Sequence, residues 1–381
     1  MKLFFLVCFI TLNSCVIVKN SLFKKFYYLP KVYQTFYTQL PYEVINGFII
    51  VEIKVNGKTC RLMVDTGSRS YISKNMKDQL NMNVFDSTFS IDITGKRIEL
   101  EKVRGLLEFG SLQLFDFKFT VKDNFFSICD SIDGILGNEI FNQGVFYFNH
   151  SNHTITITNT ISQIHDSIGF TNVSIKNKIG DLTIKHEGVR YALDSGFSNG
   201  FICTNKKSDL LNSSVNTKEL NKRIDGLSSE KYVNILYQAQ NVNLFRNEFQ
   251  GIICFTDEIK ANLLGSDWFT NNDLILDLNN KKIYIRKGEE KFEKSIESIS
   301  NFSFGHVNNT VLIDGVSSQI KMIHVGDIVQ KINGIDVINI KSKCELLDFC
   351  KSLNYEEGLT LTILKENKQE EYYFTKHQIF N

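Results

Sequence analysis

The sequence contains one short stretch twice, first as Val64-Asp65-Thr66-Gly67-Ser68 and later as Leu193-Asp194-Ser195-Gly196-Phe197. In both copies an apolar run that has an Arg four residues before the Asp ends on that Asp. An apolar run closed by turn residues is typical of a buried strand. The two aspartates are 129 residues apart, at positions 65 and 194. The repeat predicts two related structural units.

The two copies also end alike. Ile135-Leu136-Gly137 in the first copy corresponds to Leu263-Leu264-Gly265 in the second, and these glycines are 128 residues apart, at positions 137 and 265. A nearly constant offset from the aspartates to the final strands predicts two homologous lobes, at 41–160 and 165–288. Within each lobe we expect short alternating strands, with short helices only around 138–142 and 266–271.

The composition favours a mostly β protein. Phe (31) and Tyr (14) are frequent and Pro is rare (2), and aromatic and β-branched runs are separated by Asn and Gly. Lys and Arg (43) balance Asp and Glu (42), so no net field draws the chain to nucleic acid. No paired CxxC spacing indicates a zinc site, and no cofactor or metal is required by the pattern.

The N-terminus, at 1–15, is typical of a targeting segment. Lys2 precedes a short apolar run from Leu3 to Leu12, which is too short to span a bilayer comfortably. The tetrad Leu12-Asn13-Ser14-Cys15 resembles the lipobox of bacterial lipoproteins, in which the cysteine is lipidated after cleavage. We therefore expect export to the cell envelope, in the periplasm or on a membrane anchored through Cys15. Ordinary signal cleavage and an uncleaved anchor are the alternatives.

Six further cysteines permit disulfides in an exported chain, but six cysteines allow 15 connectivities. Buried free thiols are an equal alternative. The cysteines are Cys60, Cys129, Cys203, Cys254, Cys344 and Cys350.

The two Asp-Thr/Ser-Gly motifs, each followed by an apolar-apolar-Gly element, resemble the active site of bilobal aspartic peptidases of the pepsin and retropepsin type. The resemblance extends over both lobes and implies acid-protease-type β barrels with Asp65 and Asp194 as the catalytic pair. It further implies that Thr66 and Ser195 brace the two loops against each other. Gly67 and Gly196 would let the backbone pass close to the carboxylates, and Ser68 would donate a hydrogen bond to Asp65.

Two carboxyls held close together cannot both ionise, so they share one proton. One can then deprotonate a water while the other protonates the carbonyl oxygen of a peptide bond, and the titration belongs to the pair. The position that matches Ser68 in the second lobe is Phe197, which cannot donate a hydrogen bond. We therefore expect Asp194 to carry the shared proton more often.

Two hairpins are candidate flaps that close over a substrate. Their predicted tips are Thr94-Gly95 in the first lobe and Asp225-Gly226 in the second. Ordinary surface hairpins are the alternative.

The segment 300–377 resembles a PDZ domain, an α+β unit. Its most specific stretch is His324 to Val337, which contains Gly326-Asp327 and an Asn333-Gly334 turn between apolar runs. A helix at 342–353 and two strands at 359–365 and 370–375 are expected after it. The resemblance implies capture of a C-terminal peptide by strand addition, with Ser303, Phe304, Gly305 and His306 as the carboxylate loop. A degenerate domain used only for packing is the alternative.

The sequence thus predicts an aspartic endopeptidase acting on peptide or protein substrates. A non-catalytic peptide-binding protein of the same fold is the alternative, and Phe197 is the residue that keeps it open. A trypsin-like serine peptidase built on Ser195 is disfavoured, because Leu193 and Phe197 stand where that class needs glycine. Asp133 and Asp267 are further acids, which we expect to cap or turn the chain.

Overall fold

The computed structural model describes the following residues: 7–8, 15–16, 35–91, 97–122, 132–164, 168–178, 181–198, 200–225, 230–258, 262–288 and 299–380. Within them the chain is mostly β, as predicted. We call strands β3 to β12 the first β unit, strands β13 to β22 the second β unit, and residues 299–380 the C-terminal unit. The limits of the three predicted domains stay predictions. No helix in the described ranges is both long and apolar enough to cross a membrane.

The first β unit follows a short N-terminal pairing of β1 (Val7–Cys8) with β2 (Cys15–Val16). Its strands are β3 (Tyr37–Ile45), β4 (Phe48–Val55), β5 (Lys58–Val64), β6 (Tyr71–Ser73), β7 (Val84–Ile91), β8 (Arg97–Phe109), β9 (Leu112–Lys122), β10 (Gly134–Leu136), β11 (Val145–Asn149) and β12 (Thr154–Thr158). Its helical segments are α1 (Lys74–Gln79) and the 3-10 helices η2 (Asn138–Asn142) and η3 (Ile161–Gln163).

The second β unit contains β13 (Thr171–Lys178), β14 (Asp181–His186), β15 (Val189–Leu193), β16 (Ile202–Thr204), β17 (Thr217–Asp225), β18 (Glu230–Leu244), β19 (Asn247–Phe255), β20 (Asn262–Leu264), β21 (Asn272–Asp277) and β22 (Lys282–Lys287), with helix α2 (Ser266–Thr270). The two short helices expected after the Leu-Gly elements are therefore confirmed, as η2 and α2.

The C-terminal unit contains β23 (Phe302–Val307), β24 (Thr310–Ser317), β25 (Ile328–Ile332), β26 (Ile335–Asp336), β27 (Leu359–Lys365) and β28 (Lys368–Phe374), with α3 (Lys343–Ser352), η5 (Tyr355–Glu357) and α4 (Lys376–Phe380). Asn333 and Gly334 both have positive φ and join β25 to β26, which confirms the predicted turn. The unit has a hydrophobic core of its own, built around side chains such as Ile313, Leu361 and Phe374.

A tight turn feeds each of the strands that end on an aspartate. Asn56 and Gly57, both with positive φ, join β4 to β5, and Glu187 and Gly188 do the same between β14 and β15. Two-residue turns with positive φ at both positions match the twist of antiparallel strands. The same kind of hairpin therefore precedes the aspartate in both units.

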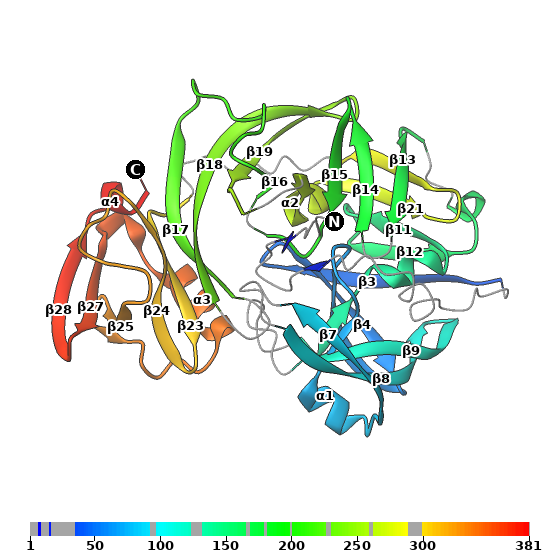
Figure 1. Ribbon diagram of the computed structural model, residues 1–381, viewed down its shortest axis with the longest axis horizontal. Helices are drawn as coiled ribbons and strands as arrows, with labels where there is room; N and C mark the ends of the chain where they lie inside the picture. The colour runs from blue at the N-terminus through cyan, green and yellow to red at the C-terminus, as the bar shows by residue number, and fades with distance from the viewer. Residues whose placement is uncertain are drawn as a thin grey trace, which may run out of the picture.

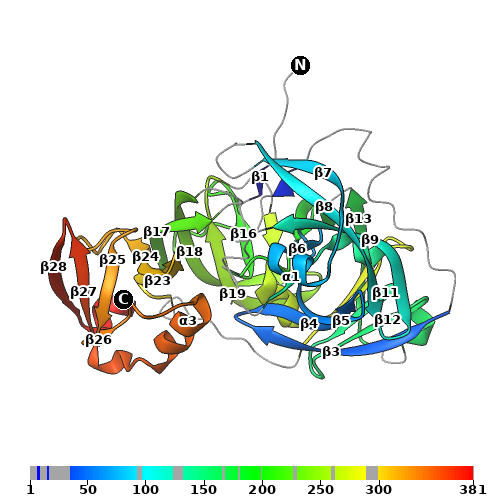
Figure 2. The same ribbon diagram turned by 90° about the horizontal axis from the view of Figure 1, so that it is seen from below.

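One sheet joins the two β units, with strand order β3-β12-β11-β21-β22-β13. Its centre is the antiparallel pairing of β11 with β21, where Val145 lies opposite Asp277 and Phe148 opposite Leu274. Equivalent strands of the two units lie at equivalent distances from this central pairing: β12 corresponds to β22, and β3 to β13. The two units are therefore related by a pseudo-twofold axis through the pairing. In Figures 1 and 2 the C-terminal unit lies at one end of the molecule, beside β17 and β18.

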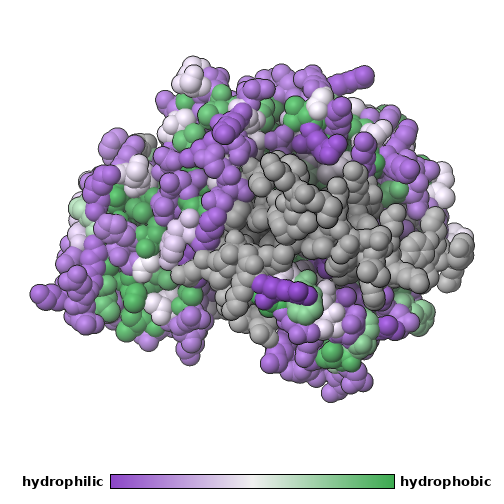
Figure 3. Space-filling model, in the orientation of Figure 1, coloured by the Kyte–Doolittle hydropathy of each residue, from purple (hydrophilic) through white to green (hydrophobic). Residues whose placement is uncertain are grey.

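Hydrophilic residues cover much of the face seen in Figure 3, and hydrophobic residues gather among them on the C-terminal unit. The exposed large apolar residues there include Ile335 and Ile338.

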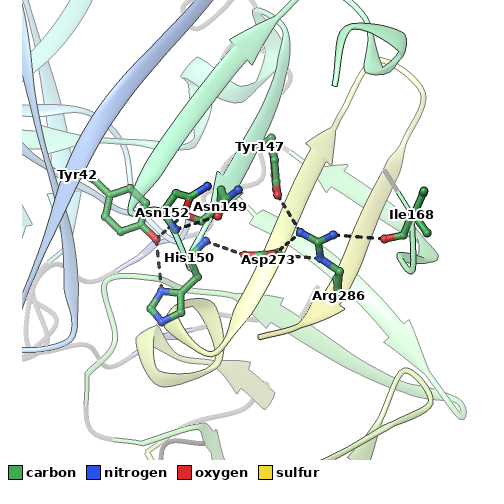
Figure 4. Close-up of polar contacts among 8 residues, drawn as sticks. All are labelled: Tyr42, Tyr147, Asn149, His150, Asn152, Ile168, Asp273 and Arg286. Atoms are coloured by element: carbon green, nitrogen blue, oxygen red, sulfur yellow. Dashed lines mark hydrogen bonds and ion pairs between the residues drawn. The ribbon is translucent and has the colours of Figure 1, made fainter. Parts of the chain in front are cut away.

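An ion pair whose carboxylate is buried lies on the second-unit side of the joining sheet (Figure 4). The carboxylate of Asp273 accepts hydrogen bonds from Arg286 at 2.7 Å and from the backbone N–H of His150 at 2.7 Å. Arg286 also donates to the hydroxyl of Tyr147 at 3.0 Å. Because His150 and Tyr147 belong to the first unit and the ion pair to the second, this network connects the two units.

We expect Arg286→Met to lower the free energy of unfolding by about 3 kcal/mol, because it leaves the Asp273 carboxylate buried without its cation. Arg61→Met is the matched control. The two arginine side chains are similarly exposed, at 26% and 28%, but the Glu43 partner of Arg61 is 63% exposed and that of Arg286 only 4%. The control should cost less than about 1 kcal/mol. Urea unfolding of the three proteins measures the difference, and equal losses would contradict the structural role of Asp273.

Candidate active site

The two repeated aspartates lie at the ends of equivalent strands. Asp65 follows β5, which runs parallel to β10, and Asp194 follows β15, which runs parallel to β20. The backbone N–H of Asp65 donates to the carbonyl of Leu136 at 3.0 Å, and that of Asp194 to the carbonyl of Leu264 at 2.9 Å. The apolar-apolar-Gly elements are therefore the partner strands that fix the start of each aspartate loop.

Hydrogen bonds across the pseudo-twofold axis hold the two loops together. The N–H of Thr66 donates to Oγ of Ser195 at 3.0 Å, and the N–H of Ser195 donates to Oγ1 of Thr66 at 3.1 Å. The Ser195 hydroxyl in turn donates to the carbonyl of Val64 at 2.8 Å. Both hydroxyl residues are fully buried. Thr66 and Ser195 thus lie where the resemblance requires them in order to brace the loops.

Each glycine of the motif lies against the carboxyl of the opposite loop. A Cβ on Gly67 would lie 2.5 Å from Cγ of Asp194, and a Cβ on Gly196 would lie 2.4 Å from Oδ2 of Asp65. Real Cβ atoms do not come this close to other atoms, so any side chain at either position would displace a carboxyl. The requirement for glycine is therefore steric.

The two carboxyl groups lie within hydrogen-bonding reach of each other, and both are buried. Burial raises the pKa of the Asp65 carboxyl to about 6, because water no longer stabilises its charge. The N–H of Gly67, which donates to Oδ1 of Asp65 at 2.8 Å, and the nearby Ser68 hydroxyl, which donates to the carbonyl of Arg69 at 3.1 Å, act in the opposite direction and lower this pKa. The carboxyl pair therefore keeps a proton up to a mildly acidic pH, near 6.

The two aspartate loops differ at the residue that follows the glycine, which is Ser68 in the first loop and Phe197 in the second. Ser68 and Phe197 accept equivalent backbone hydrogen bonds, from Asn138 at 2.9 Å and Ser266 at 2.7 Å. Ser68 provides a hydroxyl near Asp65, whereas Phe197 is buried among apolar side chains and packs over Gly265. The surroundings of Asp194 are therefore less polar than those of Asp65.

The structure describes only part of the predicted flaps. Asp225 is the last residue of β17 in the long β17–β18 hairpin, while Thr94, Gly95 and Gly226 lie outside the described residues. Cys15 lies in β2, and its side chain is outside the described part. Asp133 accepts a hydrogen bond from the N–H of Arg61 at 2.8 Å, and Asp267 lies in the first turn of α2. Asp133 directly precedes β10 and is not part of a turn, and Asp267 belongs to a helix, so neither residue forms the expected turn.

The predicted carboxylate loop is wrong as a loop. Ser303, Phe304, Gly305 and His306 lie within β23, which pairs along its length with β24. The sequence reasoning overlooked the turn Asn308-Asn309, whose residues both have positive φ and join two runs of aromatic and β-branched residues. Nε2 of His306 donates a hydrogen bond to the carbonyl of Ile340 at 3.0 Å.

Two supporting residues were missed. Oγ of Ser70 accepts a hydrogen bond from the N–H of Gly137 at 2.8 Å, and Glu139 accepts one from the N–H of Ser70 at 2.8 Å. In the second unit a backbone carbonyl takes the place of the Ser70 hydroxyl, since the N–H of Gly265 donates to the carbonyl of Phe201. No repeat signal pointed to Ser70 or Glu139, because their counterparts act without side chains.

The described residues contain no group of three or more His, Cys, Asp or Glu side chains that could hold a metal ion. Among the cysteines, Cys60, Cys203, Cys254 and Cys350 are free thiols, and Cys344 takes part in a disulfide bond.

Residues 51–140 match the family model described as aspartyl protease. The first β unit is similar to this family. The match contains Asp65 and the element Ile135-Leu136-Gly137, and Asp194 lies beyond it.

A search of curated proteins finds no match. Among solved structures, the aspartic proteinase from Irpex lacteus is similar with 12% identity and a TM-score of 0.43, over 68% of this chain and 100% of that one. Basic 7S globulin from soybean is similar with 7% identity and a TM-score of 0.41, over 66% of this chain and 95% of that one.

We expect Asp65→Asn to be more stable than the parent at neutral pH. When folding raises the pKa of a carboxyl, its contribution to stability is fully present below the pKa of the unfolded chain, near 4. This contribution is lost as the pH rises through the pKa of the folded state, about 6. A neutral amide avoids the loss, so the variant should gain up to about 3 kcal/mol at pH 7 and little at pH 4. Unfolding at both pH values measures it.

Asp78→Asn, on an exposed position of α1, is the control and should show little difference between the two pH values. A variant at position 65 that is less stable than the parent at pH 7 would contradict a raised pKa.

Proposed function

We propose that the chain is an aspartic endopeptidase in which Asp65 and Asp194 share one proton. The observation that carries this proposal is the approach of two buried carboxyls from symmetric loops, each lying against the glycine of the other. Two adjacent buried acids are costly for a fold unless they are used, and such pairs are frequent in active sites. The family match over the first β unit supports the same class of reaction.

The reaction requires one ionised and one protonated carboxyl. The ionised carboxylate removes a proton from a water that attacks the peptide carbonyl carbon, and the protonated carboxyl donates its proton to the carbonyl oxygen. The resulting tetrahedral intermediate collapses when the amide nitrogen is protonated and the C–N bond breaks. No covalent intermediate with the enzyme is formed.

We assign the shared proton mainly to Asp194 in the free enzyme. The N–H of Gly67 donates a hydrogen bond to Oδ1 of Asp65 at 2.8 Å, and the nearby Ser68 hydroxyl also favours the charge on Asp65. On the other side Phe197 offers no donor and keeps its surroundings apolar. A less polar environment favours the neutral form of a carboxyl, so Asp65 is the base and Asp194 the acid of the first step.

We expect the purified protein to cleave a diverse peptide mixture in acidic solution, with activity falling as the pH rises through about 6. Above that pH the pair loses its shared proton and the carbonyl oxygen has no acid. Asp65→Asn and Asp194→Asn should each lower cleavage at least about 100-fold, and an inhibitor of the pepstatin type should block the parent.

Ser195→Ala separates this mechanism from a serine peptidase. It removes the hydrogen bonds to Val64 and from Thr66, so it should lower stability while leaving measurable cleavage. Cleavage lost completely in Ser195→Ala but kept in Asp65→Asn would overturn the proposal.

A non-catalytic peptide-binding protein is the second candidate, favoured by the buried phenyl ring of Phe197 where the first loop has a hydroxyl. It predicts peptide binding without cleavage at any pH. Phe197→Ser would then be the variant that should restore hydrolysis.

We further propose that the chain is exported and anchored through a lipid on Cys15, and that its substrates are extended peptide segments. The proposed export and anchoring are supported by the sequence at 1–15, which has a positively charged start, an apolar run and a cysteine.

For the C-terminal unit we propose peptide binding by strand addition at β23. Among the described strands β23 pairs only with β24, and α3 lies beside it. The usual grip on a terminal carboxylate has less support, because the N–H of Asn301 just before β23 donates to the carbonyl of Ile379 at 2.6 Å. We therefore expect peptides with free and amidated C-termini to bind alike.

The C-terminal unit also contacts the candidate flap of the second unit. Strand β24 pairs with β17, where Asn221 lies opposite Val316. The ammonium of Lys218, on the same strand, is buried and donates to the carbonyls of Ile299 and Phe380. We propose that this contact sets the position of the β17–β18 hairpin over the substrate.

We expect Lys218→Met to loosen the hairpin, since it leaves two carbonyls without their donor. Amide exchange in β17 should become about tenfold faster, and KM for a peptide substrate should rise with little change in kcat. Lys207→Met, at an exposed lysine of the same unit, is the control. Unchanged exchange in β17 would refute a positioning role for Lys218.

A further inference from the structure

Two cysteines that the mechanism does not use lie side by side in the second β unit. Cys203 in β16 is directly opposite Cys254 in β19, and the two strands are parallel. Both are free thiols, with exposed fractions of 2% and 0%. Neighbouring strands lie about 5 Å apart, which is within the Cα separation that a disulfide bridges.

The two thiols also interact with each other, since the Cys254 thiol helps to raise the pKa of the Cys203 thiol. Residues paired directly across parallel strands place their side chains on the same face of the sheet. No part of the backbone therefore stands between the two sulfur atoms.

The repeat shows that the fold does not require cysteine at these positions. In the first unit Tyr71 pairs with Ile135 of β10 and with Thr120 of β9, as Cys203 pairs with Leu263 of β20 and with Cys254 of β19. Tyr71 and Thr120 are as buried as the cysteines, at 5% each, and cannot form a bond with each other. The facing thiols are thus a feature of the second unit alone.

The pair lies directly behind the Asp194 loop. Cys203 and Cys254 belong to one hydrophobic cluster with Phe197 and Leu263, which flank that loop. Burial and then the neighbouring Cys254 thiol raise the pKa of the Cys203 thiol well above its usual value. In the folded chain the Cys203 thiol is therefore protonated, and both thiols are buried, so oxidation requires this region to be open or still folding.

We propose that Cys203 and Cys254 form a disulfide bond when the chain folds under oxidising conditions, which ties β16 to β19 behind the Asp194 loop. A small-molecule disulfide such as glutathione disulfide is the oxidant. One thiolate attacks it and releases one glutathione, and the second thiolate attacks the mixed disulfide and releases another. The two cysteines lose two protons and two electrons, and one glutathione disulfide becomes two glutathione thiols.

The test compares two samples of the full-length chain. Reduced, unfolded protein is refolded either in a glutathione redox buffer or in excess dithiothreitol, and free thiols are alkylated under denaturing conditions before peptide mass mapping. The oxidised sample should contain the Cys203 and Cys254 peptides linked and lighter by two hydrogen atoms. Cys60 is the matched control, since it is equally buried but lies opposite Ile53, and it should be alkylated in both samples.

Thermal unfolding gives a second readout that needs no enzymatic activity. Closing the 203–254 loop should raise the midpoint of the oxidised parent by about 5 °C or more over the reduced parent. The difference should shrink by that amount in Cys254→Ser, where only the disulfide of Cys344 still distinguishes the two samples, and it should keep its full size in Cys60→Ser. Alkylation of both cysteines in the oxidised sample, or their linkage to other cysteines, overturns the proposal. Because neither readout involves cleavage, the result is independent of the proposed function.

Discussion

The structure depends on one constraint, which is that two carboxyl groups are held together in a place where water cannot stabilise both charges. Asp65 and Asp194 come from loops 129 residues apart and are buried against each other. The loops cannot separate without breaking the reciprocal bonds between Thr66 and Ser195, which are themselves buried. The shared proton of the proposed mechanism is the electrostatic consequence of this enforced contact.

Much of the remaining fold supports that contact from a distance. The hairpins at Asn56-Gly57 and Glu187-Gly188 lead into the strands that end on the two aspartates. The parallel strands β10 and β20 fix the ends of those strands. The sheet that contains the β11–β21 pairing and the Asp273–Arg286 ion pair sets the two units against each other. The symmetry is broken at two places. Ser68 of the first unit is replaced by Phe197 in the second, and the pair Tyr71 and Thr120 is replaced by Cys203 and Cys254.

The sequence allowed the mostly β fold and the meeting of the two aspartates to be predicted because both leave a repeated local signal. An apolar strand, a carboxyl and two small residues are enough to define each loop. The predicted helix at 342–353 and the turn at Asn333-Gly334 were likewise readable from local preferences. These features are determined by residues that are neighbours in the chain.

Features that depend on distant residues were not readable. The pairing of β17 with β24 joins segments almost a hundred positions apart and leaves no pattern in either strand. Ser303 to His306 lie in a strand because the turn is formed further on, by Asn308-Asn309. The expectation of a loop rested on the resemblance to a loop motif and ignored this turn. The contact between Cys203 and Cys254 is equally a product of strand register.

The most direct test of the central claim is a carboxyl carbon NMR titration of the folded protein, with Asp65→Asn as the reference that identifies the pair. The account predicts that the two carboxyls together hold one proton at pH 5 and release it only as the pH rises through about 6. Two carboxyls that are both fully ionised at pH 5 would contradict it, since no acid would remain for the carbonyl oxygen.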